Sequence, residues 1–308
     1  MPVPSRSANF ADLLDSRFVK IYDDRWKQLK DMIPTFYDVV SGSKAPTKDT
    51  YRTSEVGTFG DLVPFTGTIV YDDVSQGYDG TITPLEYASG FQVERKLFDD
   101  DLTGIMDGKP KGLATAYQRT RQKHAAQTFS NAFSVDTTWN SYTENVALCS
   151  NSHTTTSGAS TASGFDNLVT TAFSALTLAA ARIVMVNFRG DRAERIQIEP
   201  SLILHPPDIY QVVHEVLESE GTPDDATNAA NVHHRAYRGI EWIYLGDVNN
   251  WFLMDPVMMK DALKWVERIS AEFAMVEDFD TLLGKWRLYC RYGLGHNGWR
   301  WILGGQVS

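Results

Sequence analysis

The residues that could carry out chemistry are present in this sequence, but their spacing matches no common catalytic pattern. Gly293-Leu-Gly-His-Asn-Gly298 has the glycine spacing of a dinucleotide-binding loop and follows a predicted strand. Such a site also needs a helix that opens at the last glycine and an acidic residue about twenty positions further on. The ten residues that follow Gly298 resemble a strand instead. We therefore interpret this segment as a hairpin turn.

Histidines and cysteines are too scattered to predict a metal or nucleophile site. His233 and His234 are adjacent in a loop of small residues, and adjacent side chains point in different directions on most backbones. Cys149 and Cys290 make neither a disulfide framework nor a four-thiolate site. Cys290 alternates with apolar residues, which indicates a buried structural thiol. We predict no catalytic, cofactor-binding or metal-binding residues, and an enzyme with scattered catalytic groups stays an alternative.

The composition indicates a globular protein that does not bind nucleic acid tightly. Hydrophobic residues make up 43% of the 308 positions and charged residues 22%, which is enough for a packed core. The formal net charge is -10, whereas a nucleic-acid-binding surface needs an excess of Lys and Arg. The sequence shows no signal-type segment at its start and no apolar run of membrane-spanning length. We expect a soluble chain in a reducing compartment such as the cytoplasm.

The segment 51–97 is the strongest indication of assembly. Phe65 to Tyr71 and Thr81 to Tyr87 alternate apolar and polar residues on either side of an acidic, Gly-rich tip over 72–80, as a β-hairpin does. An isolated two-stranded ribbon is marginally stable in water and must lie on something, yet neither flank supplies an obvious sheet. We predict that the ribbon lies on another copy of the chain. Its candidate contact residues are Asp72, Asp73, Tyr78 and Asp79.

The N-terminal region predicts an amphipathic helix from Asn9 to Ile33, ended by Pro34. Its apolar stripe could pack on its own domain or dock, as a terminal arm, on a neighbouring copy. The candidate contact residues on this stripe are Phe10, Leu14, Phe18 and Tyr22.

The rest of the chain predicts a mixed α+β topology. A long helix over Lys111 to Phe133 has a thin apolar stripe, interrupted by a basic cluster that we interpret as a solvated or salt-bridged face. The Ser/Thr/Gly-rich stretch 151–163 indicates a flexible loop. The remaining predicted elements are a helix over 168–186, a strand over 196–204, a helix after Pro207, a hairpin of 240–245 with 251–254, and a final strand over 285–292 paired with 299–303.

The order of these pieces resembles a tailed-phage major capsid protein with the Hong Kong 97-type fold. The branch that it most resembles includes the Mu-type major head subunit. Two segments carry this finer resemblance, Val93-Glu-Arg-Lys-Leu-Phe-Asp-Asp-Asp-Leu102 before the long helix and Leu148-Cys-Ser-Asn-Ser-His153 before the Ser/Gly-rich loop.

The resemblance implies a division of the chain and a function. The implied parts are an N-terminal arm over 1–50, an extended loop over 51–97, a peripheral domain over 98–195 with a spine helix over 111–133, an axial domain over 196–260, and return strands over 261–308. The implied function is a structural subunit that assembles with itself into hexamers and pentamers of an icosahedral shell around phage DNA. The virion would be assembled in the cytoplasm of a host bacterium.

Further expectations follow from the resemblance. Some family members cross-link a Lys on the extended loop to an Asn, but the tip 72–80 has no Lys and the nearest is Lys96, so we do not expect this linkage. A separate scaffold protein, or removal of a scaffolding segment, is implied, together with a portal protein. Binding of decoration proteins is left open. Two alternatives remain, the shell protein of an encapsulin-like nanocompartment and an α+β enzyme.

Overall fold

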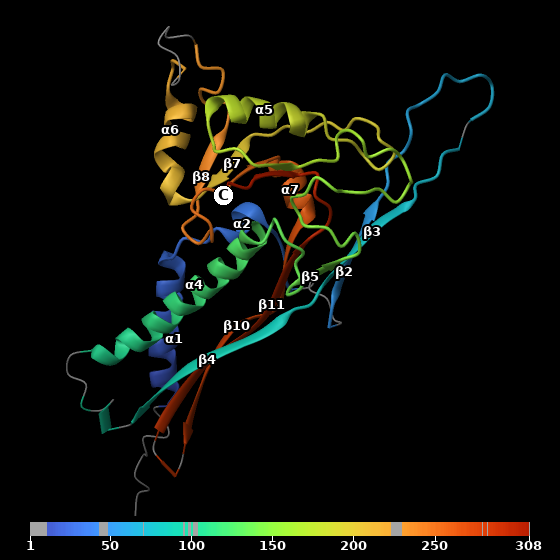
Figure 1. The fold of residues 1–308 in the computed structure, drawn as a ribbon. Helices are drawn as coiled ribbons and strands as arrows, with labels where there is room; N and C mark the ends of the chain where they lie inside the picture. The colour runs from blue at the N-terminus through green and yellow to red at the C-terminus, as the bar shows by residue number, and fades with distance from the viewer. Residues whose placement is uncertain are drawn as a thin grey trace, which may run out of the picture.

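The computed structural model describes residues 11–42, 49–69, 71–94, 96–97, 100, 104–222, 230–278, 280–281 and 283–307, with side chains from Arg17 onward. Three sheets and eight helical segments of the described residues make a mixed α+β fold, as predicted. A long narrow sheet extends downward from a wider body, and one loop projects from that body (Figure 1).

The long sheet has four strands in the order β1 (Asp38–Val40), β10 (Leu263–Asp278), β11 (Leu283–His296) and β4 (Leu85–Glu94). β10 and β11 form an antiparallel hairpin, and β4 pairs with β11 from Leu85↔Tyr292 to Glu94↔Leu283. The predicted alternation along the last strand is confirmed, with every second residue buried. Its predicted partner, 299–303, is wrong. The ribbon was expected to lie on another copy of the chain, but its β4 part pairs with β11 of the same chain.

Two helices cover this sheet. The long helix is confirmed as α4 (Gly108–Ser130), which begins three residues earlier than predicted because Pro110 is tolerated in a first turn, where its missing N–H needs no partner. α1 (Ala11–Gln28) lies against α4 and the sheet. The prediction that Pro34 ends this helix is wrong. α1 ends at Gln28, and Pro34 instead lies in the first turn of the short helix α2 (Ile33–Phe36).

The second sheet has five strands in the order β6 (Leu168–Val169), β12 (Ile302–Gly305), β9 (Trp251–Met254), β7 (Leu202–His205) and β8 (Arg238–Glu241). The predicted hairpin of 240–245 with 251–254 is wrong, because β8 and β9 pair with opposite edges of β7. β7 is also shorter than the predicted strand.

Three helices accompany the five-stranded sheet (Figure 1). α5 (Ala175–Val186) is shorter than the predicted helix because Ser174 caps it, its hydroxyl accepting from the N–H of Thr177. The predicted helix after Pro207 is confirmed as the 3-10 turn η4 (Pro207–Ile209) and α6 (Tyr210–Glu218). α7 (Pro256–Ala262) leads into β10, and the 3-10 turn η3 (Ile105–Asp107) precedes α4.

The third sheet is the base of the projecting loop. β2 (Tyr51–Val56) pairs with β3 (Gln76–Ile82), and β3 pairs with β5 (Asn140–Tyr142). The hairpin was therefore predicted in the right region but with the wrong strands. Residues 65–69 and 71 form no strand, because no strand in the described part of the chain pairs with them. The end of the loop is 57–75, and the second half of the predicted tip 72–80 belongs to β3.

A buried arginine joins the helices to the long sheet. Arg121 was predicted to lie on a solvated or salt-bridged face; it is salt-bridged, but it is also buried, with 6% of its surface exposed. Its guanidinium lies over Trp26 of α1, Tyr117 of α4 and Trp265 of β10, at 5.2, 5.5 and 5.3 Å from the ring centroids. Glu267 of β10 adds an ion pair at 3.9 Å. A single cation therefore connects three elements that are distant in sequence.

Both cysteines are buried, as predicted for Cys290. Burial raises the pKa of both thiols, which keeps them protonated near neutral pH. Within the described ranges, no group of three or more His, Cys, Asp or Glu side chains is arranged to hold a metal ion. None of the described helices is both long and apolar enough to cross a membrane.

Candidate subunit-contact surface

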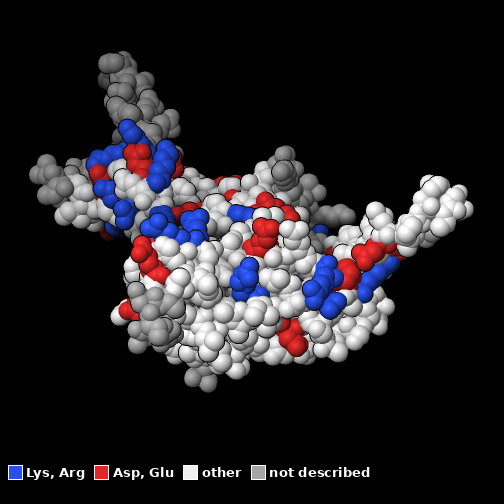
Figure 2. Space-filling model, turned by 90° about the horizontal axis from the view of Figure 1, so that it is seen from above, with Lys and Arg blue, Asp and Glu red and all other residues white. Residues whose placement is uncertain are grey.

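The extended loop, residues 57–75, carries apolar side chains that its own chain does not cover. Leu62 is fully exposed, and Tyr71 at the other end of the stretch is 89% exposed. The exposed large apolar side chains in and next to this loop are Val56, Phe59, Leu62, Val63, Phe65, Ile69 and Tyr71. Figure 2 shows the loop projecting from the body with an uncharged end and with charged side chains at its base. Exposed apolar surface of this extent marks an interaction site.

The root of the loop is fixed by charge-assisted hydrogen bonds. The Arg192 Nη1 donates to both carboxylate oxygens of Asp72, at 2.7 and 2.9 Å, and its Nη2 donates to the carbonyl of Asp73. The N–H of Gly60 donates to the same Asp72 carboxylate at 2.8 Å, so both sides of the loop meet there. The hydrogen bond from Arg192 lowers the pKa of Asp72, followed by that from Gly60. The loop therefore has a fixed base and a free end.

The segment that holds the loop is itself anchored by the Ser/Thr/Gly-rich stretch. Asp191 accepts hydrogen bonds from the Thr155 hydroxyl at 2.6 Å and from the N–H of Thr156 at 3.1 Å. The Thr156 hydroxyl also donates to the carbonyl of Gln76 in β3 at 3.3 Å. The stretch predicted as a flexible loop thus has a positioning role, because its hydroxyls connect the base of the loop to the turn that carries Arg192.

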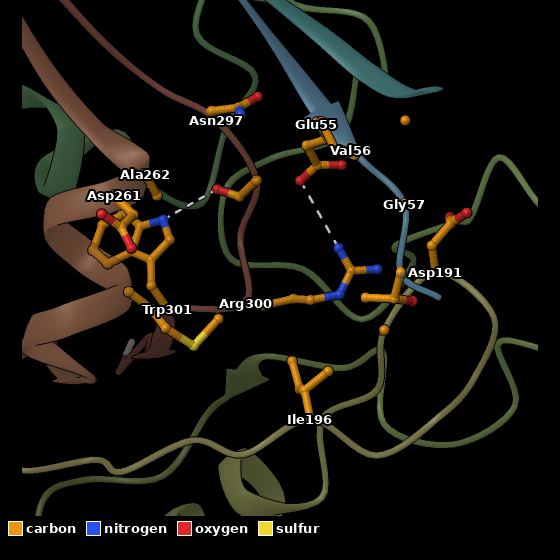
Figure 3. Close-up of a pocket in the computed structure, with 15 residues that line it drawn as sticks. Glu55, Val56, Gly57, Asp191, Ile196, Asp261, Ala262, Asn297, Arg300 and Trp301 are labelled. Atoms are coloured by element: carbon orange, nitrogen blue, oxygen red, sulfur yellow. Dashed lines mark hydrogen bonds and ion pairs between the residues drawn. The ribbon is translucent and has the colours of Figure 1, made fainter. Parts of the chain in front are cut away.

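A cavity of about 370 Å³ lies beside the base of the loop. Figure 3 shows Glu55 of β2 and Arg300 facing one another across it, with Ile196 and Trp301 among the other lining residues. The Arg300 Nη1 lies 3.8 Å from the Glu55 Oε1. Burial raises the pKa of Glu55, and the positive charge of Arg300 opposes that rise. This ion pair ties β2 to the turn between β11 and β12.

A buried histidine packs next to this pair. His153 stacks on Trp299 with ring centroids 4.2 Å apart, and its Nδ1 lies 3.1 Å from a Glu144 oxygen. Its Nε2 lies 3.2 Å from the Oδ1 of Asn167. His153 ends the short segment that carries part of the sequence resemblance. In this structure it is a packing residue inside its own chain.

The sequence-predicted contact residues fall into three groups. Asp72 and Asp73 lie in the extended loop, while Tyr78 and Asp79 lie in β3 at its base. The side chains of Phe10 and Leu14 lie outside the described residues.

Phe18 and Tyr22 are covered by their own chain. Phe18 is completely buried against Phe91 and Trp286, and Tyr22 stacks on Phe273 with centroids 5.2 Å apart. Of the two alternatives for this helix, packing on its own chain therefore holds for Phe18 and Tyr22. We therefore remove both of them from the candidate subunit contacts.

Sequence reasoning missed the residues at the free end of the loop. Phe59, Leu62 and Val63 were not singled out, and Phe65 to Tyr71 was interpreted as a paired strand. A signal was available, because no charged residue occurs between Asp61 and Asp72 while five large apolar residues and a tyrosine do. When no strand is available to pair with it, an uncharged stretch of this kind is left uncovered by its own chain.

Comparison with known proteins decides the family. A model of the family described as phage capsid protein matches residues 78–303, more than two thirds of the chain. The chain belongs to the phage capsid protein family. No curated protein matches it significantly.

Solved capsid structures support the same fold. The capsid of an empty GTA particle is 13% identical over 91% of each chain, with a TM-score of 0.54. The bacteriophage JBD30 capsid is 13% identical, covers 71% of this chain and 92% of its own, and has a TM-score of 0.51. The mature capsid of bacteriophage PhiM1 is 10% identical over 91% and 88%, with a TM-score of 0.52. This phage capsid protein has the Hong Kong 97-like fold expected from the order of its elements, and it is a structural shell protein.

Proposed function

We propose that this chain is a major head subunit that assembles with itself into hexamers and pentamers of an icosahedral shell enclosing phage DNA. The observation that carries the proposal is the extended loop, whose base is fixed and whose apolar end is uncovered. Full burial of one large apolar side chain contributes about 1.5–3 kcal/mol. A second copy that covered the exposed side chains of this loop would therefore gain much of the free energy that association requires.

The proposed contact is heterologous, because the loop of one copy would meet a different surface of the next copy. Contacts of this kind close into rings when the rotation between copies allows it. Rings of five and six copies are the capsomers proposed here. The anchoring of the loop by Arg192 supports this, since a preset loop direction lowers the ordering cost of docking.

We also propose the finer points that the resemblance implies. The segments around Val93 and Leu148 support the branch with the Mu-type major head subunit. The net charge of -10 supports a wall that contacts packaged DNA only non-specifically. A separate scaffold protein and a portal protein are the proposed partners, and the virion, assembled in a bacterial cytoplasm, is the proposed location.

The alternative with the same fold is the shell of an encapsulin-like nanocompartment. Its subunits would use the loop in the same way, so the contents of native particles distinguish the two. Phage DNA inside the particle supports the head subunit, and an enclosed protein cargo supports the nanocompartment. No observation favours an enzyme, and we do not propose one.

The loop can be shortened where the structure closes it. The N–H of Gly57 donates to the carbonyl of Ser75 at 2.9 Å, so a short Gly-Asn turn can join these residues in place of 58–74. A deletion of 72–80 is unsuitable, because it would remove residues of β3. We expect the shortened chain to unfold at an unchanged temperature, because the apolar side chains that it loses are exposed and its ion pair with Arg192 lies at the surface. It should form no closed shells in electron micrographs.

The control is the Leu62→Ser, Phe65→Ser double variant, which keeps the loop length. It should lose closed shells as well, since the apolar surface is what the proposal requires. Shells of normal size from the shortened chain would overturn the role given to the loop. Folding of each variant is checked by its far-ultraviolet circular dichroism.

A further inference from the structure

A second surface, on the other side of the body from the extended loop, has the features of a peptide-binding groove. It has a volume of about 580 Å³ and lies between α4, the end of α1 and the edge strand β8. All four residues of β8 and the three that follow it, 238–244, line the groove. Side chains alternate between the two faces of a strand, so a groove that touches consecutive residues runs along the backbone edge itself.

The edge of β8 offers unused backbone groups to this groove. β8 is the last strand of its sheet and, among the residues that the structure describes, pairs only with β7. The N–H groups of Arg238 and Trp242 donate to β7, at 2.8 and 3.1 Å. In a parallel ladder alternate residues face the same way, so the N–H groups of Gly239 and Glu241 point outward. An open strand edge of this kind is a template for another extended segment.

Buried polar atoms at the walls of the groove also lack partners. Gln118 and Gln122 of α4 are 6% and 4% exposed, and their Nε2 groups donate to the carbonyl of Lys30 and to Asp31, both at 2.7 Å. These bonds fix the amide orientation and leave both Oε1 atoms without a partner among the described residues. The indole N–H of Trp242 also lacks one there. Buried polar groups of folded proteins are normally paired, so these three covered atoms leave unmet hydrogen-bonding capacity in the walls beside the groove.

The charge at the rim indicates what the ligand carries. Lys30, Arg119 and Arg238 line the groove against one acid, Glu241. The whole chain has a net charge of -10, so another copy offers acidic segments that would complement this basic groove. A peptide backbone supplies both the acceptors and the donors that the outward N–H and C=O groups of the β8 edge can pair with, whereas a phosphate backbone supplies acceptors only.

We propose that this groove receives an extended, acidic segment of a second copy of the chain, which adds a strand to the free edge of β8. This inference rests on the proposed self-assembly and names a second contact for it. The strand would cover Ile243, which is 64% exposed at the end of the groove. The groove and the extended loop then supply two independent contacts between copies.

Hydrogen exchange read at single residues tests the proposal on the unmodified chain, with an internal control. In dilute, unassembled protein the amides of Gly239 and Glu241 should exchange fast while those of 238, 240 and 242 are protected by β7. In assembled protein at high concentration, the amides of 239 and 241 should slow by at least tenfold. Equal exchange in both states would overturn the proposal, and so would a chain that stays monomeric at every concentration.

The proline variant tests the energetic contribution. Gly239→Pro removes one outward N–H and leaves the bonds to β7 in place, whereas the control Gly239→Ala keeps that N–H. The added Cβ of the control would lie 3.4 Å from Leu217 and 3.5 Å from Val213, which is ordinary contact. We expect the proline variant to raise the concentration needed for assembly about fivefold to tenfold relative to the alanine variant. Identical assembly of the two variants would contradict the strand addition.

The chain with the shortened loop separates this inference from the proposed function. If the groove contact is independent, that chain forms no shells but still shows concentration-dependent protection of Gly239 and Glu241. Loss of protection together with the shells would mean that the edge of β8 is not a separate contact. Protection that requires added DNA or another protein would overturn the choice of a second copy.

Discussion

The Arg192 guanidinium holds the Asp72 carboxylate across the base of the extended loop, although the two residues are 120 positions apart. The same carboxylate accepts a hydrogen bond from Gly60 on the opposite side of the loop. One cation therefore sets the direction in which an otherwise uncovered loop leaves the body. For a shell protein, that direction determines whether the loop of one copy can reach the next copy.

Removal of this ion pair should loosen the loop without unfolding the chain. In Arg192→Ala, residues 58–74 should exchange amide hydrogens and be cut by proteases several-fold faster. The midpoint of thermal unfolding should stay the same, because both partners are exposed at the surface. Asp61→Asn is the matched control, since it removes an exposed acid from the same loop and should change neither measurement. Equal protease sensitivity of the Arg192 variant and the parent would contradict the tether.

The tether should also respond to pH. In the attached loop the hydrogen bond from Arg192 lowers the pKa of the Asp72 carboxyl, whereas the carboxyl of a detached loop titrates near about 3.9. The stabilisation is therefore complete above about pH 3.9 and is lost as the pH falls through the lower pKa of the attached form. Limited digestion with pepsin between pH 2 and 5 should show loop cleavage rising at the acid end. In Asp72→Asn the loop should be equally sensitive at every pH, relative to cleavage elsewhere.

Arg121 should be important for stability rather than for assembly. Arg121→Ala removes contacts with three rings and leaves Glu267 buried without its partner, with its side chain 14% exposed. Breaking a buried pair on one side costs about 3–5 kcal/mol, so the free energy of unfolding in urea should fall by about that amount. Lys123→Ala removes an exposed cation two residues further along the helix and should change the free energy of unfolding by less than about 0.5 kcal/mol. Arg121→Met with Glu267→Gln should recover part of the loss, and no recovery would argue against the ion pair.

The sequence predicted the elements better than their partners. The long helix α4 was found from its uninterrupted run without Gly or Pro after its first turn. The final strand was found from the alternation at Trp286, Leu288, Cys290 and Tyr292. Its neighbours were not found, because β4 and β10 are joined to β11 by hydrogen bonds whose register leaves no local trace in the sequence. Residues 65–71 show the converse, since β-branched and aromatic residues favour a strand only where another strand pairs with them.

The candidate site was predicted only in its region. Asp72 was named from the acidic tip, but its partner Arg192 lies in a turn whose position depends on Asp191 and the Thr-rich stretch. The burial of Arg121 was missed for the same reason. Its helix looked basic at that point, and the aromatic rings that surround it come from Trp26 and Trp265 in distant segments. Long-range contacts of this kind follow from the tertiary fold and not from local pattern.

The stability of the fold should depend on His296 in mildly acidic solution. Burial lowers the pKa of His296 to about 4, whereas an unfolded His titrates near about 6.5. Between these values the unfolded chain binds more protons than the native chain, so stability is full above about pH 6.5 and falls as the pH drops toward 4. The loss is on the order of 3 kcal/mol at about 1.4 kcal/mol per pH unit.

His296→Phe isolates this contribution, because a phenyl ring can keep the contact with Tyr142, whose ring centroid is 5.4 Å away. Urea unfolding at several pH values should show a shallower loss of stability below pH 6.5 in the variant than in the parent. The other histidines with a lowered pKa, His124, His205 and His233, are the same in both proteins and cancel in the comparison. Parallel curves for the two proteins would mean that the pKa of His296 is the same in the native and the unfolded chain.

The end of the extended loop should tolerate charge in the single chain but not in the shell. Leu62 is fully exposed and Phe65 is 74% exposed, so Leu62→Asp with Phe65→Asp costs the isolated subunit little. Docked on another copy, the same carboxylates would be buried without partners, at a cost of several kcal/mol. The matched control is Thr66→Asp with Thr68→Asp, which adds the same charge to the same loop but removes no apolar surface. Thermal unfolding of the subunit should be unchanged in both variants. Electron microscopy and light scattering should show no shells for the first variant and shells for the second. If both variants lose their shells, added charge and not lost apolar contact is the cause, and if both form shells, the loop end is not buried between copies.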